Sequence, residues 1–163
     1  MLSAKARLLT RSKWMLPTLV LLGLVLGTCA PSTPFDPIAL RQVSPDTIEL
    51  LYTPCASKTI QSVEVLVPSG QVFNDTDERR WKVVFDPPTS QQEFLLGETP
   101  PSSSVVIPWQ GLPSEETLVV LIVTASGEKD YQDFKLSDFK DQRVRFHAKN
   151  MTPEDYEKER ACK

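Results

Sequence analysis

Residues 60–67 read IQSVEVLV, residues 81–85 read WKVVF and residues 118–124 read LVVLIVT. In the first two stretches a row of large apolar side chains falls on alternate positions, which is the period of a β-strand with one buried face. The third stretch is apolar at almost every position and indicates a central strand. Three such runs, rich in β-branched residues, predict a mainly β fold.

Shorter runs of the same kind surround these three, and clusters of Pro, Gly, Ser and Asp separate them. They cover residues 47–52, 93–96, 104–107, 131–136 and 144–148. Eight candidate strands at spacings of roughly 10–20 residues are typical of an antiparallel β-sandwich. We therefore expect residues 43–163 to form a sandwich of the immunoglobulin/fibronectin-like kind.

The C-terminal end carries the signals of one short helix. Thr152 is a helix-capping residue, and Pro153 follows at the first helical position. Glu154 and Asp155 come next, where acidic side chains meet the positive end of the helix dipole. Basic residues follow in the last turn, which is the favourable end for cations. The pattern predicts a helix from Pro153 to about residue 161.

The chain has 163 residues, of which 40% are hydrophobic, and this is enough for one domain with a small core. Its charge is distributed unevenly. Residues 1–28 carry four basic residues and no acidic one; removing those four from 18 leaves 14 basic against 21 acidic residues in 29–163. This acidic part has a net charge of −7 and no Lys/Arg stripe, which argues against nucleic acid as a partner.

The N-terminal segment has the layout of an export signal. Residues 1–13 are basic, residues 14–26 are almost wholly apolar, and small residues follow. A helix over the apolar stretch reaches roughly 20 Å, which is short of the ~30 Å hydrocarbon core of a bilayer. The order of these regions therefore indicates a signal segment over residues 1–28 rather than a membrane-spanning helix.

The signal ends in Leu26-Gly27-Thr28-Cys29, which resembles the lipobox of bacterial lipoprotein precursors. That class has an apolar residue three positions before a cysteine and small residues between them, and Thr28 stands where Gly, Ala or Ser is usual. The resemblance implies that the Cys29 thiol receives a diacylglycerol carrying fatty acyl chains such as palmitate. It also implies that the signal is cut just before Cys29.

A proline-rich segment links this cysteine to the expected domain. Residues 30–37 read APSTPFDP, and so many prolines disfavour helix and sheet and favour an extended strap. We expect residues 29–42 to form a lipid-anchored tether. The sequence then indicates a lipoprotein of the cell membrane that displays its sandwich domain outside the cytoplasm. Its expected role is structural, adhesive or that of an accessory subunit, with a protein partner that the sequence does not identify.

Other fates of the N-terminal segment stay open. Ordinary signal cleavage, for example after Ser32, would release a soluble domain. An uncleaved helix from Trp14 to Ala30 would have 17 residues, the lower limit for spanning a bilayer, and would anchor the same domain as a single-pass membrane protein. A small extracytoplasmic enzyme is the third class of function, and it would need a pocket that groups acidic residues with His147.

The chain has three cysteines, Cys29, Cys55 and Cys162. If Cys29 is acylated or removed with the signal, Cys55 and Cys162 remain as a pair in an oxidising compartment, where we expect them to form a disulfide. The bond would tie the end of the first predicted strand to the C-terminal helix. A reactive or metal-binding pair is the alternative, but the sequence contains no CxxC spacing.

The single histidine lies on a predicted strand. Alternation places His147 on the polar face of that strand with Arg143, Arg145 and Lys149, where we expect it to be exposed. A catalytic histidine needs a nucleophile and an orienting acid, and the sequence marks neither. The basic face could contact anionic headgroups or an acidic polymer, although such faces are usually only solvated.

Two further motifs have structural interpretations. Asp75, Asp77 and Glu78 lack the spacing of a calcium loop, so we expect an acidic loop between two strands. Trp109, in PWQGLP, is expected to plug one end of the sandwich, although an aromatic residue on a loop can also serve recognition. The sequence contains no GxSxG, HExxH, P-loop or dinucleotide fingerprint. We expect no enzymatic activity, no cofactor and no metal site.

Overall fold

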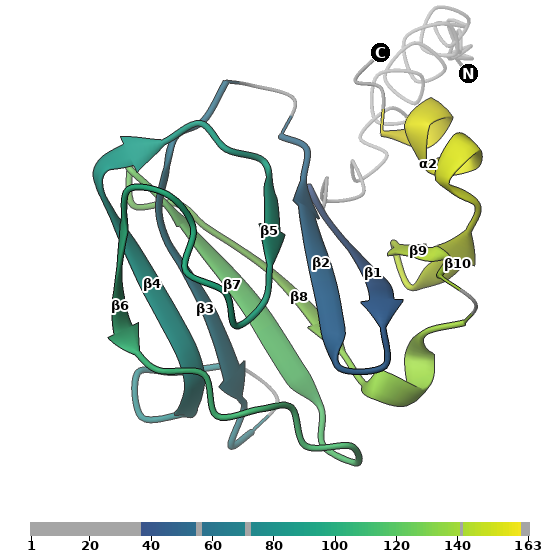
Figure 1. The fold of residues 1–163 in the computed structure, drawn as a ribbon, viewed down its shortest axis with the longest axis horizontal. Coiled ribbons are helices and arrows are strands. Elements are labelled where there is room, and N and C mark those ends of the chain that lie inside the picture. The colour runs from purple at the N-terminus through teal and green to yellow at the C-terminus, as the bar shows by residue number, and fades with distance from the viewer. Residues whose placement is uncertain (1–36, 55–56, 71–72, 141, 161–163) are drawn as a thin grey trace, which may run out of the picture. The chain divides into compact units, whose positions relative to one another are not determined.

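Two antiparallel β-sheets, followed by one short helix, make up the folded part of the chain that the structure describes (Figure 1). The structure is a computed structural model, and it describes residues 37–54, 57–70, 73–140 and 142–160. The strands are β1 Ile38–Ser44, β2 Thr47–Tyr52, β3 Ile60–Val67, β4 Glu78–Thr89, β5 Glu93–Leu95, β6 Ser103–Ile107, β7 Leu118–Thr124, β8 Lys129–Phe134, β9 Val144–Phe146 and β10 Lys149–Met151. The helices are the 3-10 helix η1 Leu136–Asp138 and the α-helix α2 Pro153–Glu159.

Each sheet has five strands. One has the strand order β10-β9-β1-β2-β5 and the other has the order β6-β4-β3-β7-β8, and all neighbouring strands are antiparallel. The three strongest apolar runs of the sequence lie side by side at the centre of the second sheet as β4, β3 and β7. Strands β3 and β7 have the predicted ends, and β4 is longer than the predicted run 81–85. The expected mainly β, sandwich-like fold with a short C-terminal helix is confirmed.

The first sheet differs from the prediction in two places. Strand β1 begins at Ile38, so residues 38–42, which the composition assigns to the tether, are part of a strand that pairs with β2 and β9. The strand predicted over 144–148 ends at Phe146, because His147 and Ala148 have positive φ angles of 48° and 60° and turn the chain back into β10. Positive φ at both central positions is the geometry of a two-residue hairpin turn, and its usual Asn-Gly signal is missing here.

The main hydrophobic core lies between the two sheets. In this core, Leu40 of β1 and Leu50 of β2 pack together with the inward side chains of β3, β4 and β7. Alternation along the predicted strands identifies the central residues of this core correctly, because successive side chains of a strand point to opposite faces. These residues are Val63, Val65, Trp81, Val83, Phe85, Val120 and Ile122.

Helix α2 has the predicted cap and is fastened to the first sheet. Thr152 Oγ1 accepts a hydrogen bond from the Asp155 backbone N–H. Tyr156 is buried in a second, smaller core, where its ring meets Phe146 edge-on with 5.3 Å between the ring centroids. Its hydroxyl lies 3.3 Å from Thr53 Oγ1, just after the end of β2. These contacts hold a helix that is too short to be stable alone in water.

Trp109 packs against the main core, as the sequence analysis expects. Its ring is nearly perpendicular to that of Trp81, with 6.2 Å between the centroids. Gly97 lies close to the indole ring of Trp109. A Cβ atom added to Gly97 would stand 2.6 Å from Trp109 Cδ2. The φ of Gly97 is +89°, which disfavours any side chain. A glycine is therefore required here for two independent reasons.

Replacing Gly97 by alanine is expected to lower the free energy of unfolding by about 2–4 kcal/mol, because the variant bears both a left-handed backbone and an overpacked contact. The matched control is Gly127→Ala. Gly127 has a similar φ of +83° but no atom within 4 Å of the added Cβ, so this variant should lose only the backbone contribution of about 1–2 kcal/mol. Chemical denaturation of both variants measures the difference. Equal losses would show that the Trp109 contact is not tight.

Candidate functional site

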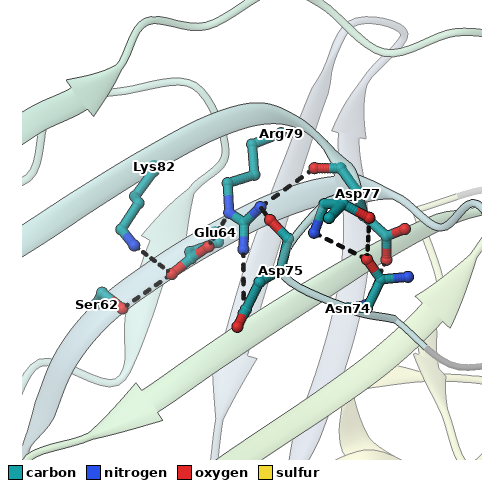
Figure 2. Close-up of polar contacts among 8 residues, drawn as sticks. Ser62, Glu64, Asn74, Asp75, Asp77, Arg79 and Lys82 are labelled. Atoms are coloured by element: carbon teal, nitrogen blue, oxygen red, sulfur yellow. Dashed lines mark hydrogen bonds and ion pairs between the residues drawn. The ribbon is translucent and has the colours of Figure 1, made fainter.

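The outer face of the sheet β6-β4-β3-β7-β8 carries a buried charged residue. Glu64 of β3 is only 3% exposed, and it points away from the main core because its neighbours Val63 and Val65 point into that core. Arg79 Nε donates to Glu64 Oε2 at 2.9 Å, and Lys82 Nζ donates to Oε1 at 2.8 Å (Figure 2). Two cations of β4 therefore hold one buried carboxylate of β3.

Both oxygens of this carboxylate are occupied. Ser62 Oγ also donates to Glu64 Oε1, at 3.4 Å. Burial opposes ionisation of Glu64, but the hydrogen bonds and charges of Lys82 and Arg79 outweigh it, so the pKa of Glu64 is lowered below its ordinary value. A carboxylate that stays ionised and is held by two cations is a poor general base. The arrangement is suited to fixing β3 against β4.

This pairing predicts a stability that depends on pH. The folded pKa of Glu64 lies below the unfolded value of about 4.3, so the contribution is complete above that pH and is lost as the pH falls through the folded pKa. Glu64→Gln is expected to cost about 1.5–3 kcal/mol at pH 7, because it removes hydrogen bonds to a charged group.

Denaturant titrations of the wild type and Glu64→Gln at pH 7, 5, 4 and 3 test this prediction. The free-energy difference between the two proteins should shrink only below about pH 4.3. Glu93→Gln, at an exposed position of β5, is the control and should show little difference at any pH. A Glu64→Gln penalty that is the same at pH 3 and pH 7 would mean that ionisation of Glu64 does not contribute.

Sequence reasoning does not identify Glu64 as a buried residue. A glutamate between two valines of a strand usually indicates a solvated outer face. This face is covered, because Leu66, Val119 and Leu121 are also buried on it and Phe73 of the β3–β4 loop packs against them. Whether a face of a strand is buried depends on contacts with segments that are distant in the sequence. The hydrophobic periodicity of a single strand gives no information about those segments.

The acidic loop between β3 and β4 is held together by its own hydrogen bonds. Asp77 accepts from the Ser69 backbone N–H at 2.9 Å, from Ser69 Oγ at 2.6 Å and from the Asn74 backbone N–H at 2.7 Å. These hydrogen bonds lower the pKa of Asp77 below its ordinary value. Arg79 also donates to the backbone oxygens of Asp75 and Asp77 (Figure 2). Asp75 and Asp77 thus lie in a loop between two strands, as expected, whereas Glu78 is the first residue of β4. The carboxylate of Asp77 stabilises the loop itself.

A groove of about 500 Å³ lies on the same outer face. Its lining includes Phe73, Val119, Tyr131 and Asp133. The Phe73 and Tyr131 rings meet edge-on with 5.0 Å between their centroids, and Tyr131 is 55% exposed. An exposed tyrosine fixed by a second ring, with a carboxylate on the same strand, can receive a side chain of another protein.

A second polar cluster ties the two sheets together. The Tyr52 hydroxyl of β2 donates to Asp130 Oδ2 of β8 at 2.6 Å. Lys58 Nζ lies 3.5 Å from the same oxygen and 2.7 Å from Glu128 Oε1. Burial, then the hydrogen bond to Asp130 and the nearby negative charges, raises the pKa of Tyr52 far above its ordinary value, so the hydroxyl stays protonated as a donor.

The four basic residues predicted to share one exposed strand face around His147 differ in their positions and contacts. His147 is exposed, as expected, but it lies in the β9–β10 turn rather than on a strand. Its ring stacks on that of the preceding residue with 3.9 Å between the centroids. Arg145 is partly buried and pairs with Asp138 of η1 at 3.1 Å, whereas Arg143 and Lys149 are exposed. Arg145 therefore has a structural role in holding β9 against η1.

The three cysteines lie outside the described residues. This holds for Cys29 at the predicted lipidation site, for Cys55 and Cys162 of the predicted disulfide, and for the whole of residues 1–36. In the part of the chain that the structure does describe, no helix has the length and apolar character needed to cross a membrane. Within the same ranges, no three His, Cys, Asp or Glu side chains are grouped so that they could hold a metal ion.

Comparisons with protein-family models, with curated proteins and with solved structures give no match for this chain. It is a mainly β protein with two antiparallel five-stranded sheets, a sandwich-like core and one short C-terminal helix. Its most distinctive side-chain features are the buried Glu64 cluster and the groove beside Tyr131 on the outer face of one sheet.

Proposed function

We propose that this chain is an exported lipoprotein, anchored in the cell membrane by acyl groups on Cys29 and displaying its β domain outside the cytoplasm. The observation that carries this proposal is the order of signals at the N-terminus. A basic region and a short apolar region are followed directly by Leu26-Gly27-Thr28-Cys29, which resembles a lipobox. A diacylglyceryl group supplies two acyl chains, and two anchoring signals are what stable membrane attachment requires.

The start of the folded domain is compatible with a short tether. Pro37, the first described residue, stands eight positions after Cys29. A segment of that length spans at most about 26–29 Å when fully extended. The Pro37 backbone oxygen accepts a hydrogen bond from the Thr53 backbone N–H at 2.8 Å, so the chain is fixed to the domain from this residue onward. A lipid on Cys29 would hold the domain close to the membrane surface.

We also propose that the domain belongs to the immunoglobulin/fibronectin-like sandwiches. Strand β2 lies between β1 and β5, and β3 lies between β4 and β7, with β8 next to β7. This order is similar to the A-B-E and C′-C-F-G pairing of that architecture, and the similarity supports the proposal. Strand β6 beside β4 and the β9–β10 hairpin beside β1 would then be additions at the sheet margins.

The proposed role is that of a structural, adhesive or accessory subunit that binds another protein. The groove beside Tyr131 supports this role, because it combines an exposed tyrosine, a second ring and a carboxylate on a rigid sheet. Exposed aromatic residues in such settings are typical contact residues of protein interfaces. A membrane-held domain of this size offers its partner a sheet face rather than a deep pocket.

The intact mass of the mature protein, isolated from bacterial membranes, tests the proposal. We expect a chain that begins at Cys29 and carries the added mass of a diacylglyceryl group, with or without a further N-terminal acyl chain. A full-length, unmodified chain in the membrane would instead support an uncleaved anchor over residues 14–30. A cleaved chain without lipid in the soluble fraction would support ordinary signal cleavage, and either result would overturn the lipoprotein proposal.

A further inference from the structure

The four edges of the two sheets are not equally protected against pairing with another chain. A sheet edge presents unpaired backbone N–H and C=O groups, and proteins usually block it with short strands or charged side chains. Strands β5 and β10 have three residues each. Strand β8 carries Lys129, Asp130 and Asp133. Strand β6 has five residues, Ser103–Ile107, and none of them is charged.

The absence of charge extends well beyond β6. No Asp, Glu, Lys or Arg occurs from Thr99 to Ser114, although 24% of the whole chain is charged. Charged residues that flank an apolar strand are the usual safeguard against edge pairing. Strand β6 and the residues that flank it therefore lack the charged side chains that usually prevent edge pairing.

Strand β6 also presents apolar side chains to solvent. Val105 is 43% exposed and Val106 is 56% exposed, and these are two of the three exposed large hydrophobic residues in the described part of the chain. Strand β6 lies at the margin of its sheet beside β4 (Figure 1). Among the described residues, β4 is the only strand that pairs with it. Its second edge therefore combines backbone hydrogen-bonding groups with exposed valines.

Other features limit how far this edge could pair. Pro101 and Pro108 bracket β6, and a proline cannot donate a ladder hydrogen bond. The pairing with β4 shifts by one residue between Val105 and Ile107, which leaves Val106 as a bulge. Any added ladder must therefore be short. A short edge of this kind favours a closed pair over an open-ended stack of strands.

We propose that β6 pairs with β6 of a second copy of this chain, in antiparallel orientation about a two-fold axis through Val105. In this register Val105 faces Val105 of the other copy, and Ser104 of each copy faces Val106 of the other. The interface is isologous, so it closes at two copies. The two sheets β6-β4-β3-β7-β8 then form one continuous ten-stranded sheet across the dimer.

A second copy fits this edge better than a strand of different chemistry. The edge carries no charge that a partner would have to match, and it offers only backbone groups, hydroxyls and valines. An identical strand supplies the same groups and no unpaired charge, which avoids the cost of burying one. The contact is small compared with the ~1,200 Å² of a stable interface, so we expect a weak dimer. The pairing does not require the lipid, although confinement in a membrane would strengthen it.

Cysteine cross-linking tests the two-fold axis. Ser104→Cys, Val105→Cys and Val106→Cys are made separately in the full chain, and in parallel with Cys29→Ala, so that lipid-anchored and unanchored proteins are compared. Residues directly opposite in an antiparallel pair have Cα atoms about 4.5–5.5 Å apart, which is within disulfide range. We expect disulfide-linked dimer to be about tenfold more abundant for Val105→Cys than for the other two variants.

An edge-blocking variant supplies the second readout. Val105→Lys places two like charges opposite each other and is expected to weaken self-association, measured by analytical ultracentrifugation, by about tenfold or more. The matched control is Gln92→Lys, which adds the same charge at an exposed position just before the edge strand β5 of the other sheet. It should leave self-association unchanged. Circular dichroism and thermal unfolding confirm that both variants remain folded.

The outcomes separate the dimer from the lipoprotein proposal. A cross-linking maximum at Val105 together with loss of self-association in Val105→Lys supports the β6 dimer, whether or not Cys29 is acylated. Uniform or absent cross-linking, a maximum at Ser104 or Val106, or a monomer up to about millimolar concentration would overturn it. Equal effects of Val105→Lys and Gln92→Lys would show a nonspecific effect of the added charge and would overturn it as well.

Discussion

Replacing Cys29 by alanine is expected to abolish stable attachment of the mature domain to the membrane. The Cys29 thiol is the only group in the Leu26–Cys29 segment that can accept a thioether-linked diacylglycerol. Each buried CH₂ of an acyl chain contributes about 0.8 kcal/mol, so two chains account for most of the anchoring free energy. Without them, the variant should either retain its signal or appear in the soluble fraction, and no lipid-bearing, signal-cleaved form should be found.

Membrane fractionation combined with intact mass spectrometry measures this effect. Cys55→Ala is the control, because it removes a different thiol outside the predicted signal, and it should be acylated and cleaved like the wild type. A Cys29→Ala protein that is cleaved and retained in the membrane to the wild-type extent would contradict the lipoprotein proposal. An uncleaved, membrane-bound form in both the wild type and the variant would favour an anchor over residues 14–30.

Loss of a disulfide between Cys55 and Cys162 is expected to have the second largest effect. Both cysteines lie outside the described residues, but the contact between Tyr156 and Thr53 supports the pairing. It brings α2 to the end of β2, and Cys55 follows Thr53 by only two residues, a span of at most about 7 Å. The bond would close a loop of 107 residues by sequence difference (162 − 55), and a closure of that length stabilises a protein by about 4–5 kcal/mol in the chain-entropy model.

A mutant cycle distinguishes a bonded pair from two independent thiols. If the bond exists, Cys55→Ser, Cys162→Ser and the double variant should lose nearly the same free energy of unfolding, because each removes the whole cross-link. Helix α2 should be released first, since Tyr156 is its one buried side chain. The core between the sheets should remain folded. Additive losses, or two freely reactive thiols in the unreduced exported protein, would contradict the disulfide.

Local pattern predicts the central strands of the second sheet, whereas its edge strand β8 spans Lys129–Phe134 rather than the predicted 131–136, and the margins of the first sheet are not predicted. Alternating apolar residues mark β3, and a continuous apolar run marks β7, so both strands are recognised from their own sequence. Strand β1 follows directly after a proline-rich segment, and its sequence IALRQVS does not alternate cleanly. Its residues are buried on both sides, by the main core at Leu40 and by the smaller core at Ala39.

Local sequence patterns are sufficient to predict the mainly β class, the central core residues and the capped C-terminal helix, and they also predict lipidation at Cys29. These depend on short-range signals, namely strand period, capping chemistry and the order of basic, apolar and small residues. The burial of Glu64, the contact between Trp109 and Gly97, and the position of β6 at a sheet edge that no other described strand pairs with emerge from the folded structure. Burial and strand pairing depend on which distant segments cover a residue, and no local pattern records those neighbours.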